Sequence, residues 1–399
     1  MKFDPATELQ KIMNLSPFDG VNPVISDSAT FAFSKGAVMQ DTFEGKTEGC
    51  FLYSRHWNPT NHRLADALSA MEGAEAGWVT SSGMAAITST VLQICNSGDH
   101  IISTLTEYGG TYAFFKNYLP KFNIDVTFVN ITDLEAVKKA IRPNTKILYT
   151  ETMTNPLLQI SDLPALADIA HHNNMKLVVD NTFTPMIVTP LQWGADIVVY
   201  SMTKFINGKN DVIAGAICGK QEFIDSLIDV HDGTAMLLGP VLGPLHASAI
   251  LKNLNTLHVR MKKHSENAGY LAGKFKEAGI KIDYPGLPDH PGHEVLKRTM
   301  NTQYGYGGMI AIDLETIERA NDLMVAMQEK GVGYLAVSLG YFKTLFSNSG
   351  ASTSSEIPLE EQKKMGLSEG LVRFSVGLDM DIEYTWNNIE TCLKDLKMI

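Results

Sequence analysis

The tetrapeptide Ser201-Met202-Thr203-Lys204 places one amine and two hydroxyls directly after the largely apolar run 195–200. A lysine amine that is partly withdrawn from water loses its proton more easily and can form a Schiff base with an aldehyde. The hydroxyls one and three residues before it suit a phosphate. An aldehyde and a phosphate on one small molecule point to pyridoxal 5'-phosphate (PLP).

A second short run, Lys176-Leu177-Val178-Val179-Asp180, ends in a carboxylate 24 residues before Lys204. Apolar runs of this kind are typical of parallel strands buried on both faces, and ligands lie at the carboxyl ends of such strands. An aspartate there can hold a pyridinium nitrogen protonated, so that the ring accepts electrons. The spacing of Asp180 and Lys204 fits one strand-to-strand connection.

Further polar residues also follow predicted strands. Ser81-Ser82-Gly83-Met84 lies between a strand and a helix, where free backbone N–H groups bind anions. Tyr108 follows the strand around 100–103 and can stack on a ring and pass a proton. Asn155 follows the strand around 146–149 and can donate to a ring hydroxyl. Taken singly, each of the two is explained more simply as an ordinary residue in a turn.

Two arginines are candidates for binding anions. Arg55, two residues after Tyr53, can clamp a phosphate through two N–H groups. Because this segment is remote from the sheet in sequence, we expect the clamp to come from a partner chain. Arg373, on a late strand, is the candidate for binding a substrate carboxylate.

Other chemistries fit the sequence less well. Ser201 and Lys204 also match the S-x-x-K pattern of penicillin-recognising acyl hydrolases, but the companion S-D-N and K-T-G strings are absent. The segment 289–293 holds two histidines in a Pro- and Gly-containing loop, which we interpret as surface residues. We therefore expect no metal site.

The composition bounds the class of protein. The chain has 399 residues, 44% of them hydrophobic, which allows a large core and about two domains. A net charge of −11 and a pI near 5.5 argue against nucleic acid or an anionic membrane as partner. The four cysteines show no metal or disulfide spacing, and neither a signal peptide nor a membrane span is recognisable. We expect a cytoplasmic protein.

The periodicity predicts an α/β fold that positions these residues. Residues 1–57 are irregular and are expected to form an N-terminal arm that contacts a neighbouring subunit. In 58–255, short apolar runs alternate with helical patterns, which predicts a mostly parallel sheet with helices on both faces. Helical periodicity persists unusually long over 245–278, and two further strand-like runs follow. We therefore expect a smaller C-terminal α+β domain over 256–399.

Seven motifs together resemble the Cys/Met-metabolism family of PLP-dependent enzymes, of fold type I, from about residue 22 to the C-terminus. They occur in the family's order and spacing: YSRHWNPT, SSGMAAI, EYGGT, ETMTNP, VVDNTF, SMTKFINGKNDVIAGAICG and LVRFSVGLD.

The resemblance implies a role for each motif. Lys204 bonds the cofactor aldehyde and moves protons of the substrate, and Asp180 pairs with the ring nitrogen. Tyr108 stacks on the ring and protonates the γ leaving group. The remaining assignments are phosphate binding by Ser82, Gly83, Met84, Ser201 and Thr203, with Tyr53 and Arg55 of a neighbouring subunit, contact with the ring by Asn155, and substrate binding by Arg373 and Ser338. The family forms dimers that pair into tetramers, so the resemblance implies a homotetramer with shared active sites.

Within the family, the segment 336–356 resembles the methionine γ-lyase branch, in its plant-type form. Val337 stands where cystathionine-handling members usually carry glutamate, and a valine suits a thioether methyl. Two positions depart from the branch: Gly110, where many bacterial members have cysteine, and Lys343, where glutamate is frequent.

The resemblance thus implies a PLP-dependent lyase that performs α,γ-elimination on L-methionine, with homocysteine as a further candidate. The products are 2-oxobutanoate, ammonia and a thiol. Two alternatives stay open: γ-replacement, as in O-acetylhomoserine sulfhydrylase or cystathionine γ-synthase, and γ-elimination on another amino acid such as cystathionine or canavanine.

Overall fold

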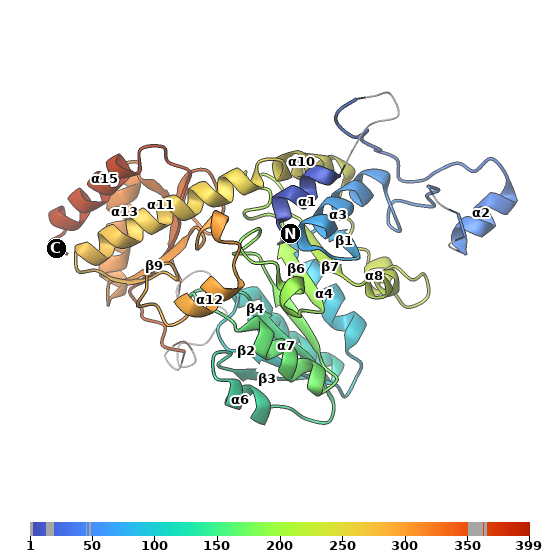
Figure 1. Ribbon diagram of the computed structural model, residues 1–399, viewed down its shortest axis with the longest axis horizontal. Coiled ribbons are helices and arrows are strands. Elements are labelled where there is room, and N and C mark those ends of the chain that lie inside the picture. The colour runs from blue at the N-terminus through green and yellow to red at the C-terminus, as the bar shows by residue number, and fades with distance from the viewer. Residues whose placement is uncertain (1–2, 13–19, 45, 48, 350–361, 363–364) are drawn as a thin grey trace.

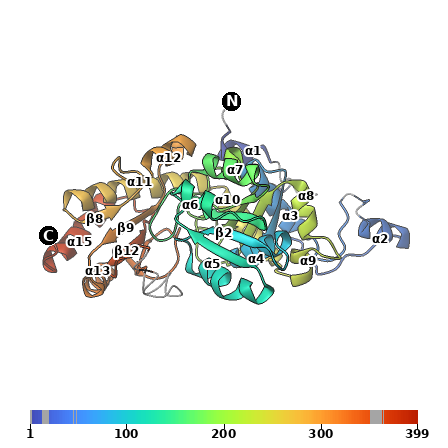
Figure 2. The ribbon, with the colours of Figure 1, turned by 90° about the horizontal axis from the view of Figure 1, so that it is seen from below.

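The computed structural model describes residues 3–12, 20–44, 46–47, 49–349, 362 and 365–399. It contains two β-sheets that lie side by side, each packed against helices (Figures 1 and 2). The larger sheet is formed by residues 76–219 and the smaller one by residues 281–375. The boundary at 255–256 falls in the short link between two helices and remains our proposed division of the chain.

The larger sheet has the order β1-β7-β6-β5-β4-β2-β3. Its strands are β1 (Ala76–Thr80), β2 (His100–Thr104), β3 (Asp125–Val129), β4 (Thr145–Glu151), β5 (Lys176–Asp180), β6 (Ile197–Ser201) and β7 (Gly215–Gly219). The five strands β2 to β6 are mutually parallel, whereas β7 pairs antiparallel with both β6 and β1. The predicted mostly parallel sheet is confirmed.

Strand β5 illustrates why an apolar run forms a central strand. Val178 packs in one hydrophobic cluster with helix α4 (Gly83–Ile94), and its neighbours Leu177 and Val179 pack in another with α3 (Pro59–Glu72). All three side chains are fully buried. Because both faces of the strand are covered, the alternation seen in half-exposed strands is absent.

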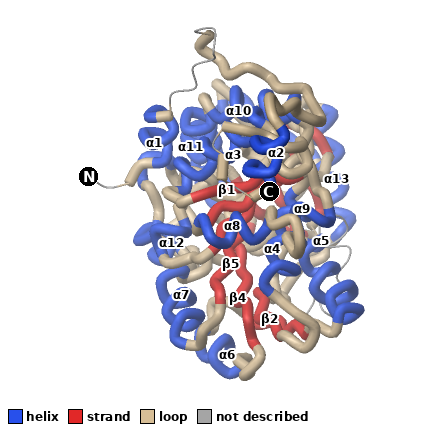
Figure 3. Tube along the Cα trace, turned by 90° about the vertical axis from the view of Figure 1, so that its right-hand side faces the viewer, coloured by secondary structure: helices blue, strands red, loops and turns tan. Residues whose placement is uncertain are grey.

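Helices cover both faces of the larger sheet, as Figure 3 shows with the strands enclosed. Besides α3 and α4, the helices of this part are α5 (Gly109–Ala113), α6 (Leu134–Lys139), α7 (Leu163–His172), α8 (Gln221–Leu227), α9 (Thr234–Leu238) and α10 (Pro244–Leu254). Asn58 caps the start of helix α3, because its side chain accepts the backbone N–H of Thr60 at 2.9 Å. This cap places the start of the helix at the predicted domain start.

The smaller sheet has the order β10-β11-β12-β9-β8 and is antiparallel except for the pair β10 and β11. Its strands are β8 (Lys281–Asp283), β9 (Met309–Asp313), β10 (Gly333–Leu335), β11 (Thr344–Asn348) and β12 (Leu371–Ser375). Its core is shared with α11 (Leu257–Glu277), α13 (Ile317–Glu329) and α15 (Ile382–Asp395), and α12 (His293–Thr299) lies nearby. The predicted strands at 309–314 and 371–376 are found here.

Three expectations need correction. The helical segment 245–278 is two helices, because the chain leaves the helix at Asn255-Thr256 between α10 and α11. The arm 1–57 is not wholly irregular: it contains α1 (Pro5–Lys11) and α2 (Gly36–Phe43). Figures 1 and 2 both show α2 standing away from the rest of the chain. One of the two loop histidines, His293, is buried rather than on the surface.

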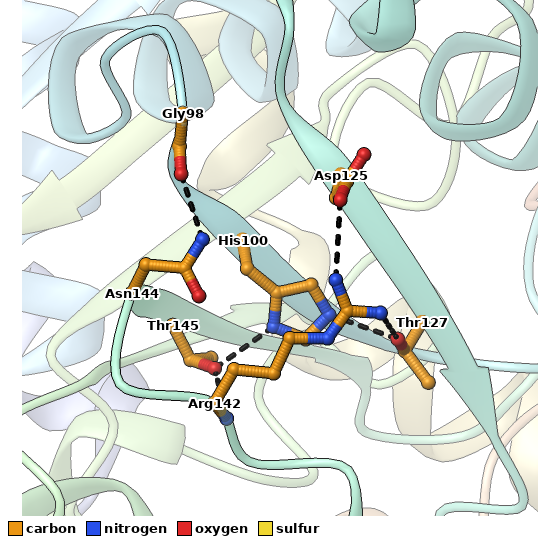
Figure 4. A network of polar contacts seen from close by, with 7 residues as sticks. All are labelled: Gly98, His100, Asp125, Thr127, Arg142, Asn144 and Thr145. Atoms are coloured by element: carbon orange, nitrogen blue, oxygen red, sulfur yellow. Dashed lines mark hydrogen bonds and ion pairs between the residues drawn. The ribbon is translucent and has the colours of Figure 1, made fainter.

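A polar network around the buried His100 ties together the amino-terminal ends of β2, β3 and β4 (Figure 4). The ring nitrogens of His100 lie 2.8 Å from the hydroxyl of Thr145 and 2.9 Å from that of Thr127. Arg142 donates to both Thr127 and Asp125 at 3.1 Å. This network lies at the edge of the sheet opposite to the carboxyl ends of the parallel strands.

Candidate active site

The carboxyl ends of β4, β5 and β6 open into a cavity of about 400 Å³. The side chains from the large sheet are joined there by residues 337–339 and by Arg373 of β12. The cavity is lined by eleven of the predicted site residues: Ser82, Gly83, Met84, Tyr108, Asn155, Asp180, Ser201, Thr203, Lys204, Ser338 and Arg373. The site is therefore built by both halves of the chain.

Lys204 follows β6 and is partly buried. Burial, and secondarily the nearby Arg373 guanidinium, lower the pKa of Lys204 to about 8. Its ammonium donates to the hydroxyl of Ser338 at 3.2 Å. Such an amine is neutral much more often than an ordinary surface lysine, which favours a nucleophilic role.

Asp180 ends β5 and faces the same cavity. Burial raises the pKa of Asp180 to about 6, and hydrogen bonds from Thr182 act in the opposite direction. The backbone N–H of Thr182 donates to its carboxylate at 2.9 Å. A protonated ring nitrogen is the kind of cation that would relieve the cost of burying this charge.

The start of α4 is packed closely against the end of β6. The Ser82 hydroxyl caps the helix by accepting the N–H of Ala85 at 3.1 Å. A Cβ added at Gly83 would lie 2.7 Å from the Cβ of Ser201, so only glycine allows this approach. The helix N-terminus and the Ser201 and Thr203 hydroxyls thus line one cavity, as a bound phosphate requires.

Arg373 is only 3% exposed. One of its terminal nitrogens donates to the side-chain oxygen of Asn155 at 2.9 Å, and the other approaches the carbonyl of Ser338 at 3.5 Å. Its Nε is buried and has no hydrogen-bond partner among the described residues. A buried guanidinium with an unused donor suits an anionic group such as an amino-acid carboxylate.

The donors and cavity walls together fit PLP. The Lys204 amine, the Asp180 carboxylate and the start of α4 with its close approach at Gly83 all line one cavity. Among the described residues, no group of three His, Cys, Asp or Glu side chains could hold a metal ion.

Tyr53 and Arg55 are not brought to this cavity within the chain. Tyr53 is exposed, and Arg55 donates to the carbonyl of Met236 at 2.8 Å. Their expected position in the site of a neighbouring subunit therefore stays a proposal.

Of the three positions that bear on the branch of the family, only Val337 lines the cavity. Val337 lines the cavity, whereas Lys343 does not and instead has its ammonium 5.9 Å from the ring centroid of Tyr334. Gly110 packs under Tyr108: a Cβ there would lie 2.6 Å from the tyrosine ring. Residues 350–356, the last part of the segment that indicated the branch, lie outside the described residues.

Sequence reasoning missed several lining residues. Glu151, Met153, Thr182 and Phe183 belong to the ETMTNP and VVDNTF motifs but received no role. For Glu151 a signal existed, since an acid at the end of one strand lies beside Asp180 at the end of the next. The side-chain contacts that give it importance are visible only in the fold.

Comparison with known proteins agrees with this site. Residues 8–394 match the profile described as Cys/Met metabolism PLP-dependent enzyme. A methionine γ-lyase of Arabidopsis thaliana is 43% identical over 97% of this chain and 89% of its own length. A cystathionine γ-lyase of Bacillus subtilis is 38% identical over 94% of this chain and 97% of its own.

The fold of this chain also matches a solved structure of a related enzyme. The putative O-acetylhomoserine (thiol)-lyase of Campylobacter jejuni, which carries a pyridoxyl group on a lysine, superposes with a TM-score of 0.91. It is 26% identical, and the match covers 98% of this chain and all of that one.

Proposed function

Because the chain belongs to the Cys/Met metabolism family of PLP-dependent enzymes, we propose that it is a methionine γ-lyase. Its fold is PLP fold type I, its cofactor is PLP, and its substrates are small amino acids. The proposed reaction is α,γ-elimination of L-methionine to 2-oxobutanoate, ammonia and methanethiol, with homocysteine as a second substrate.

The apolar part of the cavity is the observation that favours methionine over cystathionine as the substrate. Val337 lines it where an acid would be needed to pair with the distal ammonium of cystathionine. Further apolar side chains line the same space: Met84, Ile87, Met153, Phe183, Ile213 and Leu339. A thioether methyl loses no hydrogen bond on entering such surroundings, whereas an ammonium would.

Each residue has a proposed part in this reaction. PLP, when bound, supplies an electron sink for negative charge at the substrate carbons. Arg373 holds the α-carboxylate and Asp180 holds the proton of the ring nitrogen. The amine nitrogen of Lys204 would take the α-proton and deliver it to the bound cofactor, which leaves the amine free to take a β-proton. The hydroxyl of Tyr108 gives its proton to the departing γ-sulfur.

A panel of amino acids that differ at the γ position tests the proposal. We expect 2-oxobutanoate release from methionine to exceed release from cystathionine, canavanine and O-acetylhomoserine, without added thiol. A strict requirement for sulfide would instead identify the γ-replacement reaction, the alternative favoured by the likeness to a thiol-lyase structure.

Lys204→Ala tests the remaining alternative, the acyl hydrolase that Ser201 and Lys204 would form. The purified protein should be yellow, and the variant should lose this visible absorbance together with activity. A colourless wild-type protein that reacts with β-lactams would reject the PLP mechanism.

The proposal also covers the assembly of the enzyme and its place in the cell. We place Tyr53 and Arg55 in the site of a neighbouring subunit, within a homotetramer. We also place the enzyme in the cytoplasm, where its four cysteines, all free in the structure, would stay reduced. Among the residues that the structure describes, none of the helices combines the length and the hydropathy of a membrane span.

A further inference from the structure

Glu151 is a buried acid in the active site to which the proposed reaction gives no task. It ends β4, is 6% exposed, and lies opposite Asp180 in the pairing of β4 with β5. Both its carboxylate oxygens are engaged. The first accepts the backbone N–H of Tyr108 at 2.8 Å, and the second accepts the backbone N–H of Asn155 at 2.7 Å.

These two bonds reach the two groups that handle the substrate. Tyr108 directly precedes α5, so a bond to its backbone N–H fixes the position from which its ring enters the cavity. Asn155 connects Glu151 to Arg373, because the side-chain oxygen of Asn155 accepts a hydrogen bond from Arg373 at 2.9 Å. One carboxylate thus joins three segments that lie far apart in the sequence.

The charges around Glu151 favour the same arrangement. Burial, and next the Asp180 carboxylate, raise the pKa of Glu151, while its two backbone donors and the Arg373 guanidinium oppose this shift. With PLP bound, the protonated ring nitrogen and Arg373 supply two positive charges for the two carboxylates. An ionised Glu151 can accept both backbone N–H groups, which an amide in its place cannot do.

We propose that Glu151 is a positioning residue that sets the orientation of Tyr108 and, through Asn155, of the carboxylate-binding Arg373. The proposal rests on the roles given above to Tyr108 and Arg373. It predicts that changing Glu151 harms recognition of the α-carboxylate more than it harms the fold or cofactor binding.

The test compares the PLP-loaded wild-type enzyme with Glu151→Gln. The glutamine NH₂ would face one of the two backbone N–H groups, so one hydrogen bond is lost. We expect affinity for L-norvaline, an amino acid without a γ leaving group, to fall about 10- to 100-fold in a spectral titration. Affinity for 3-(methylthio)propylamine, which has no carboxylate, should change much less.

Glu107→Gln is the matched control. Glu107 is also fully buried, but it accepts a hydrogen bond from Ser103 at 2.6 Å rather than from Tyr108 or Asn155. This variant should bind both ligands nearly as the wild type does. If Glu151→Gln does not retain PLP, Glu151→Asp, which keeps the charge but is one methylene shorter, takes its place in the comparison.

Equal loss of affinity for both ligands, or no loss for either, would overturn the positioning role. Arg373→Lys separates this result from a failure of the proposed function. If that variant weakens norvaline binding while Glu151→Gln does not, Arg373 keeps its role and only the inference about Glu151 fails. If Arg373→Lys also binds norvaline normally, the carboxylate site itself has been misassigned.

Discussion

The amine of Lys204 and the hydroxyl of Ser338 lie 3.2 Å apart, although 134 residues separate them in the chain. The first follows β6 of the larger sheet and the second precedes β11 of the smaller one. The Lys204 amine therefore lies where both halves of the chain meet, and there burial and Arg373 lower its pKa to about 8.

This pKa predicts how PLP-free protein captures its cofactor. Only the neutral amine attacks an aldehyde, so the rate of capture should rise about tenfold per pH unit below pH 8 and level off above it. Growth of visible absorbance after adding PLP measures the rate. In Arg373→Gln, which removes a nearby positive charge, the plateau should move to higher pH. A rate still rising at pH 10 in the wild type would contradict the lowered pKa.

Val337→Glu should change the choice of substrate. A carboxylate there can pair with the distal ammonium of cystathionine and places a charge beside the methionine thioether. We expect the ratio of kcat/KM for cystathionine over methionine to rise roughly tenfold. Val337→Gln, similar in size but uncharged, is the control. If both variants shift the ratio equally, charge is not the cause.

Gly110→Ala should impair catalysis while leaving the fold intact. The new methyl group would lie 2.6 Å from the ring of Tyr108, which must move, and Gly110 does not have a positive φ that would add backbone strain. We expect kcat/KM to fall roughly 10- to 100-fold, with little change in Tm. Gly273→Ala, in helix α11 with open space around it, should leave kcat/KM unchanged and should not lower Tm, because alanine favours the helix. Full activity in Gly110→Ala would show that the ring position is not critical.

Sharing of active sites can be tested by mixing two inactive variants. If Arg55 serves the neighbouring subunit, Arg55→Ala and Lys204→Ala should each be inactive, but hybrid oligomers should regain activity. One of their sites then has both wild-type residues. The measurement is 2-oxobutanoate release after co-expression of differently tagged chains. Hybrids that form and stay inactive would place Arg55 and Lys204 in the site of the same chain.

The network around His100 predicts a loss of stability in acid. Burial, and next the Arg142 guanidinium, lower the pKa of His100 from 6.5 to about 4, with Asp125 acting in the opposite direction. Between these values the unfolded chain binds the proton and the folded chain does not, so the free energy of unfolding falls as pH decreases from about 6.5 to about 4. Above pH 6.5 this contribution is fully present.

Urea unfolding of wild type and His100→Gln at several pH values measures the effect. The variant should be less stable by about 1–3 kcal/mol at pH 7, because it loses buried hydrogen bonds to Thr127 or Thr145. The difference should shrink toward pH 4. A difference that stays constant with pH would mean that His100 does not titrate on unfolding in this range.

The sequence was sufficient where the signal is local. The apolar run before Asp180 and the run before Lys204 each form a strand, because their side chains are apolar on both faces whatever surrounds them. The start of α4 was predicted from Ser82 and Gly83 for a similarly local reason, because the pattern lies directly between a strand and a helix. The strands that escaped prediction include β8 and β10, of three residues each, which are too short to show a period.

Tertiary structure alone decided which distant groups meet. Arg373 donates to Asn155 across 218 residues. The Glu151 carboxylate accepts the backbone N–H groups of Tyr108 and Asn155, because the β2–α5 loop and the segment after β4 fold over the same strand end. No residue pattern encodes such contacts, since they depend on how the loops fold at the strand ends and, for Arg373, on how the two sheets pack. Side-chain type and periodicity are local properties of the chain, whereas hydrogen-bond geometry and burial arise only when remote segments are brought together.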